Sequence, residues 1–94
     1  MVNLGNVYLS ENRLHEAMSV LRQAVQQKPD DALAHFNLGL VYDKLGRGDM
    51  ALGEYMKVVQ YAPEGKLAED ARQKMSKLSE LWRNKNTDQP RQFP

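Results

Sequence analysis

The sequence predicts an all-α protein in which two tandem antiparallel helix–turn–helix repeats are followed by a closing helix. Three observations support this prediction: a recurrence every 34 residues, apolar residues at helical spacing, and Asn, Gly or Pro at the expected helix ends. A chain of 94 residues is one domain with a modest core. The expected helices cover residues 1–11, 14–28, 31–45, 48–61 and 66–84.

The recurrence is clearest in two six-residue segments, Asn3–Tyr8 and Asn37–Tyr42, which are identical at five positions. Self-similarity at one fixed period is typical of repeat proteins, whose units bury their apolar faces against each other. The same offset of 34 residues also pairs Ala17 with Ala51, Leu21 with Tyr55, Ala24 with Val58, and Pro29 with Pro63.

The first helix of each unit has a leucine and a tyrosine four residues apart, and therefore on one face. A glycine, Gly5 or Gly39, follows the leucine, although glycine inside a helix costs about 1 kcal/mol relative to alanine. Its recurrence predicts that the second helix of the unit approaches closely, at the small residue Ala17 or Ala51. The leucine–tyrosine pairs are Leu4 with Tyr8 and Leu38 with Tyr42.

The helix ends are equally regular. Asn12 and Gly46 stand between the paired helices, and both residue types accept the left-handed backbone that ends a helix. Pro29 and Pro63 prevent the second helices from continuing, and Asp30 is predicted to cap the next helix. The second helices carry the apolar stripes Ala17, Leu21, Ala24 and Ala51, Tyr55, Val58, beside which Tyr61 is expected to pack.

The third unit does not continue the pattern, because Arg72, Gln73 and Ser76 stand where Leu, Gly and Tyr would recur. A stripe with spacings of three and four instead predicts a closing helix, apolar toward the last repeat and charged outward. The segment 85–94 is polar, contains two prolines and is predicted to be disordered. The stripe consists of Ala68, Ala71, Met75, Leu78 and Trp82, and Trp82 is expected to anchor the helix.

These residues resemble the tetratricopeptide repeat family, whose 34-residue pattern is W-x2-L-G-x2-Y, then Ala, an x3-spaced aromatic residue, and Pro. Met1 and His35 occupy the tolerant Trp position, and Leu21 and Tyr55 replace the usual phenylalanine. The resemblance covers residues 1–65 and implies stacked hairpins in a right-handed superhelix. The predicted domain, residues 1–84, consists of repeat one (1–31), repeat two (32–65) and a capping helix (66–84).

The first helices of this family line a concave groove that holds an extended or helical peptide of a partner protein. A second apolar face on the helix at 31–45 supports such a groove here. Phe36 and Leu40 either line the groove or pack against the neighbouring first helix, and the asparagines either bond a peptide backbone or are solvated. The groove is assigned to Asn3, Asn6, Leu33, Phe36, Asn37, Leu40 and Lys44.

One subfamily of co-chaperones binds the C-terminal carboxylate of heat-shock proteins through two asparagines and three basic residues in this groove. Asn6 and Asn37 fall at the two asparagine positions, but Val2, Leu67 and Ala71 stand at the three basic positions. A terminal carboxylate would lack a charge partner there, so this activity is not expected.

Composition and motifs argue against other functions. The 13 basic and 12 acidic residues give a net charge of +1, which does not favour nucleic acid. The chain has no cysteine, and His15 and His35 are interpreted as helix-surface residues rather than metal ligands. No catalytic or phosphate-binding motif occurs, so neither an enzyme nor a cofactor is predicted. Membrane insertion is not expected, and the compartment is unknown beyond a cytoplasmic default.

The leading hypothesis is therefore a protein-interaction scaffold. The alternative is a self-association module in which repeats stack between chains. Met1 lies only three residues before Leu4, and about three repeats are usually needed for stability. The chain is accordingly expected to be a piece of a longer array or to form a homo-oligomer.

Overall fold

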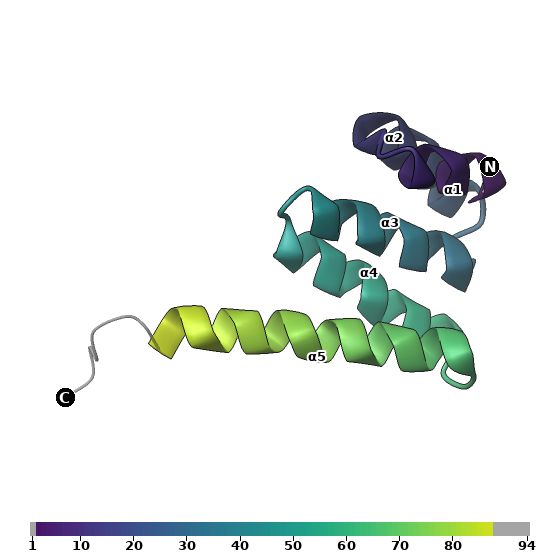
Figure 1. The fold of residues 1–94 in the computed structure, drawn as a ribbon. Helices are drawn as coiled ribbons and strands as arrows, with labels where there is room; N and C mark the ends of the chain where they lie inside the picture. Colours follow the sequence, from purple (N-terminus) through teal and green to yellow (C-terminus); the bar gives the residue numbers. More distant parts are fainter. Residues whose placement is uncertain (1, 88–94) are drawn as a thin grey trace.

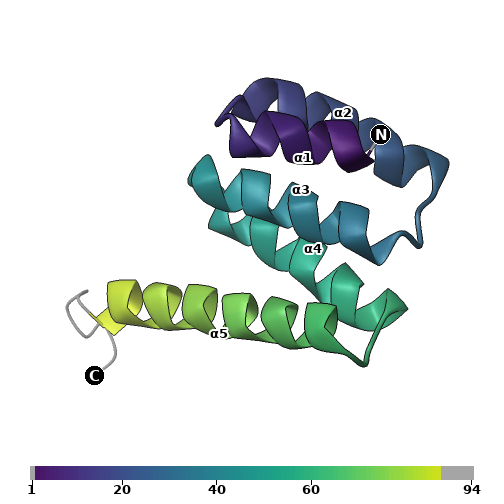
Figure 2. The ribbon, with the colours of Figure 1, turned by 45° about the vertical axis from the view of Figure 1, so that its right-hand side comes forward.

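The computed structural model describes the backbone of residues 2–87 and the side chains of residues 4–81. Over this part the chain forms five helices and no strand (Figure 1), which confirms the all-α prediction. The helices pack in chain order, as two hairpins followed by the last helix (Figure 2). They are α1 (Val2–Ser10), α2 (Leu14–Gln27), α3 (Ala32–Lys44), α4 (Gly48–Tyr61) and α5 (Lys66–Thr87).

The two hairpin turns are equivalent in conformation and in hydrogen bonding. Asn12 has a φ of 60° and Gly46 a φ of 80°, so both adopt the predicted left-handed conformation. The residue after each one closes the turn by donating its backbone N–H to the tyrosine carbonyl of the first helix. These bonds, Arg13 N to Tyr8 O and Arg47 N to Tyr42 O, are both 2.8 Å long.

The connection between the repeats differs from the prediction at one residue. Asp31, not Asp30, is the N-cap of α3, and its carboxylate accepts a hydrogen bond of 3.2 Å from Ala34 N. The reason is spacing: an N-cap side chain reaches the backbone N–H two or three residues ahead, and α3 begins at Ala32. Pro29 follows the C-cap of α2, as expected of a residue that cannot continue a helix.

The core confirms the close approach of helices within each unit but changes the contact. A Cβ atom on Gly5 would meet Leu21, and one on Gly39 would meet Tyr55. The large residue of the second helix therefore covers the glycine, one turn beyond the predicted alanine. The alanines at that predicted contact, Ala17 and Ala51, are fully buried in the same core.

Equivalent residues of the two first helices have unequal burial. Leu38 is 2% exposed and Val41 is fully buried, whereas Leu4 is 45% and Val7 is 47% exposed. The prediction that Leu4 lies in the core is therefore wrong. The physical reason is that α3 packs between α2 and α4, while α1 contacts only α2 and α3 among the described helices.

Helix α5 closes the array against α4. Ala68 and Ala71 are fully buried, and Met75 and Leu78 pack against the core, in agreement with the predicted stripe. The side chain of Trp82 lies outside the described residues. The helix continues to Thr87, so the first three residues of the predicted disordered segment 85–94 are helical, and residues 88–94 lie outside the described part.

Candidate protein-binding surface

The helices α1, α3 and α5 follow one another along one side of the array. Contacts join α1 to α3 and α3 to α5, in addition to the contacts within each hairpin. In Figure 2 these three helices can be followed from the purple end of the chain to the yellow-green end. A segment of another protein that lies along this side would therefore meet residues from all three helices.

A cavity of about 290 Å³ opens between α3 and α5. The predicted groove residue Phe36 is its only lining residue from α3. The ring of Phe36 is half-buried and also packs against Tyr55, with the ring centroids 5.7 Å apart. The two alternatives for Phe36, packing and lining a groove, are both correct. The α5 residues that line the cavity are Asp70, Gln73, Lys74 and Lys77.

The other predicted groove residues differ in accessibility. Asn6, Leu33 and Lys44 are exposed, with 44% of Leu33 open to solvent. Leu40 is half-buried and packs against the core. The side chain of Asn3 lies outside the described residues.

Asn37 is not the solvated surface residue that one interpretation predicted, because only 4% of it is exposed. Its amide nitrogen Nδ2 is buried without a hydrogen-bond partner among the described residues. An unpaired buried donor costs roughly 1–3 kcal/mol, which is a large part of the stability of a small domain.

The interpretation of His35 as a surface residue is also wrong. His35 is 3% exposed, and its Nε2 donates a 2.6 Å hydrogen bond to the carbonyl of Pro29. Its Nδ1 lies 2.7 Å from Oε1 of Glu54, and its ring stacks on Tyr61. His35 thus joins the loop between the repeats to α4. The family pattern places a large buried residue at this position, which is the signal that could have corrected the interpretation.

The α5 residues of the cavity were absent from the predicted site, although the repeat period indicates them. Asp70 and Lys74 follow Phe36 and Leu40 by the same 34 residues that relate the two repeats, and Lys77 follows Asp43 in the same way. The prediction was incomplete because the leucine, glycine and tyrosine of the core motif are lost in α5. The groove positions nevertheless keep their phase, since α5 docks on α4 like a first helix.

The cavity lining carries a net positive charge. Asp70 is half-buried and forms an ion pair of 3.3 Å with Lys66, one turn before it in α5. Lys74 and Lys77 form no ion pair with another described side chain. By contrast, Leu67 is half-buried against the core and Ala71 is fully buried, so two positions of the carboxylate-binding co-chaperones present no cation here.

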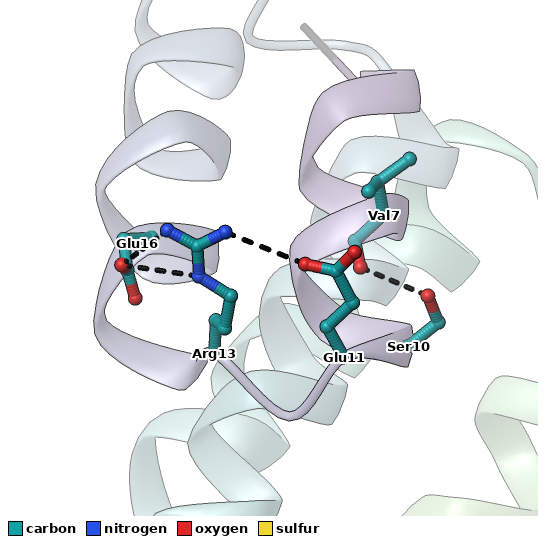
Figure 3. Close-up of polar contacts among 5 residues, drawn as sticks. All are labelled: Val7, Ser10, Glu11, Arg13 and Glu16. Carbon is teal, nitrogen blue, oxygen red and sulfur yellow. Dashed lines mark hydrogen bonds and ion pairs between the residues drawn. The ribbon is translucent and has the colours of Figure 1, made fainter.

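A polar cluster at the first hairpin turn is separate from this surface (Figure 3). The Arg13 guanidinium donates to Oε2 of Glu16 at 2.9 Å from Nη2, pairs with Glu11 at 3.4 Å and lies over the ring of Tyr8. The hydrogen bond from Arg13 holds the pKa of the Glu16 carboxyl below its ordinary value. All of these groups belong to one turn and its flanking helices, so we interpret the cluster as a turn-stabilising contact.

Paired antiparallel helices that pack in sequence define an α-helical repeat protein. Two family models match the chain: one for the TPR repeat over residues 5–46 and one for the tetratricopeptide repeat over residues 32–64. The chain belongs to the tetratricopeptide repeat family, as its sequence predicted. Repeats of this family generally mediate protein–protein interactions and are typically non-catalytic.

One curated relative is the human Protein O-mannosyl-transferase TMTC1, which is 32% identical over 74 residues. The match covers 79% of this chain but only 8% of that protein. Within the part of the chain that the structure describes, no helix combines the length and the hydropathy needed to cross a membrane.

Proposed function

We propose that the chain is a non-catalytic scaffold that holds a segment of a partner protein along the side formed by α1, α3 and α5. The main support is the cavity between α3 and α5, because it places an aromatic side chain and polar side chains within reach of one ligand. Family membership supports the same role.

Within this proposal the accessible groove residues act in two ways. Phe36, Leu33 and Leu40 offer apolar surface, and Asn6 and Lys44 offer polar contacts at the edges. Asn37 would donate its unpaired amide to a backbone carbonyl of the ligand once side chains at the groove move apart. Asn3 is retained as a proposed contact at the start of α1.

Selection of a displayed random peptide library against the full chain tests this proposal. Selected peptides should bind less tightly to the Phe36→Ala variant, by at least roughly fivefold for a buried apolar contact. Because Phe36 also packs against Tyr55, Leu33→Glu provides a second variant at an exposed groove position. Met56→Ala is the control, since Met56 is an exposed apolar residue of α4. Equal binding to the wild type and to both groove variants would contradict the proposal.

A second candidate function, self-association, is favoured by a different observation. Leu4 and Val7 expose about half of their surface on α1, while their equivalents in α3 are buried between helices. Another chain that packed on α1 would bury these side chains in the same way. Sedimentation of the wild type should then show a concentration-dependent dimer that Leu4→Lys abolishes, and a monomer at all concentrations would exclude this candidate.

A further inference from the structure

We infer that the cavity between α3 and α5 selects partner segments that carry an acidic side chain beside an apolar one. This inference rests on the proposed scaffold function and adds the chemistry of the ligand. It concerns side-chain carboxylates within a segment, not the carboxylate at the end of a chain.

The acidic preference follows from the charges around the cavity. Lys74 and Lys77 lie three residues apart on α5, on one side of the helix, and both line the cavity. Neither is neutralised by another described side chain, whereas the carboxylate of Asp70 is already paired with Lys66. An acidic side chain of a ligand would therefore meet two cations, and a basic one would meet only an occupied carboxylate.

The apolar preference follows from Phe36. Its ring lines the cavity on the α3 side and is supported from behind by Tyr55, which is fully buried. The volume of about 290 Å³ is at the lower end of ligand pockets, which span roughly 300–1,000 Å³. Such a space holds one or two side chains of a longer segment. The apolar side chain would cover the ring while the carboxylate reaches the lysines.

The positions of the cations distinguish this ligand from a chain terminus. In the carboxylate-binding co-chaperones the basic positions correspond to Leu67 and Ala71 on α5, and both are packed into the core here. Lys74 and Lys77 lie farther along α5, beside Phe36. A segment that passes through the groove can reach them with an internal aspartate or glutamate.

The test uses a random peptide library displayed with its C-terminus fused to the carrier, so that no free terminal carboxylate is present. The full chain, the Lys74→Gln/Lys77→Gln double variant and a Lys57→Gln control are used as targets. Lys57 is an exposed lysine of α4, so the control removes a similar charge away from the cavity. Circular dichroism confirms that each variant is folded.

The expected result is enrichment of Asp and Glu beside apolar residues in peptides selected by the wild type and by Lys57→Gln, but not by the double variant. A selected acidic peptide should bind the wild type roughly fivefold tighter than its Asn or Gln counterpart, the upper effect of a partly exposed ion pair, and less tightly at high salt. Selected peptides that depend on Phe36 but show no acidic preference would overturn this inference and leave the scaffold function intact. Peptides insensitive to Phe36→Ala and Leu33→Glu would contradict the scaffold function itself.

Discussion

The backbone of Gly39 lies directly against the ring of Tyr55, so that a Cβ atom on Gly39 would be only 2.6 Å from Cε1 of the tyrosine. Gly5 and Leu21 repeat this relationship in the first unit, at 2.5 Å from Cδ2 of the leucine. Tyr55 and Leu21 are both fully buried, so neither side chain has space to retreat. The two glycines are therefore packing residues that allow the helices of a unit to touch.

We predict that Gly39→Ala destabilises the protein by about 1–3 kcal/mol, although alanine is the better helix former, because overpacking outweighs the gain of about 1 kcal/mol in propensity. Gly53→Ala is the matched control, since Gly53 lies in α4 and a Cβ there would meet nothing within 4 Å. It should stabilise the protein by roughly 0.5–1 kcal/mol. Urea denaturation measures both, and equal effects of the two variants would contradict the packing role.

The hydroxyl of Tyr55 leads to a second prediction. It is buried without a hydrogen-bond partner among the described residues, and burial raises the pKa of the phenol well above its ordinary value. Tyr55→Phe should therefore leave the stability unchanged or increase it by about 1 kcal/mol. Phenylalanine is also the residue that the family pattern favours at this position.

The same variant changes the pH dependence. In the folded protein the phenol stays neutral, whereas in the unfolded chain it ionises near pH 10. The free energy of unfolding of the wild type should therefore decrease as the pH rises above 10, and this decrease should be smaller for Tyr55→Phe. Thermal denaturation at pH 8 and pH 11 measures the difference. A steeper decrease for the variant would contradict this assignment.

The contact between His35 and Glu54 is expected to be energetically coupled. Removing one partner leaves the other buried without its hydrogen bond, so His35→Ala and Glu54→Ala should each destabilise by about 1–3 kcal/mol. A double-mutant cycle should give a coupling of roughly 1 kcal/mol or more. His15→Ala is the control at an exposed histidine and should be almost neutral. Additive effects of the two alanine variants would show that the pair does not interact.

The Arg13–Glu16 pair should stabilise the first hairpin turn only while Glu16 is ionised. Because Arg13 lowers the pKa of Glu16, the stabilisation is present above the ordinary glutamate pKa and is lost as the pH falls through the lowered value. An NMR titration should show the lowered pKa, and 1 M salt should bring it closer to the ordinary value. Glu16→Gln should reduce the stability at pH 7 but not at pH 3, whereas Glu64→Gln, at an exposed residue, should have little effect at either pH.

Much of the fold could be predicted because the repeat supplies its own evidence. The turn residues Asn12 and Gly46, and Pro29 after α2, each mark a helix end for a local steric reason. The burial of Leu4 could not be predicted in this way. It depends on which helix lies beside α1, whereas the identity of Leu4 with Leu38 records only that the repeats have the same pattern.

The candidate site was less predictable for two physical reasons. Polarity alone suggested that Asn37 and His35 face solvent, but their positions on α3 place them inside the packed helices. The cavity also needs α5, whose charged residues resemble an ordinary solvated face. Lys74 and Lys77 can be recognised only when the repeat period is continued past the point where the core motif ends.

Helix α5 also shows how few changes end the array. Thirty-four residues after Ala34, Asn37 and Val41, all buried in α3, α5 keeps small or apolar residues, namely Ala68, Ala71 and Met75. Gln73 and Ser76 replace the glycine and tyrosine that would receive a second helix, and both are exposed. A terminus therefore requires polar residues only on the side where the next helix would have docked. Restoring that side should allow further units to be appended, since each would reuse the contacts already present between the existing repeats.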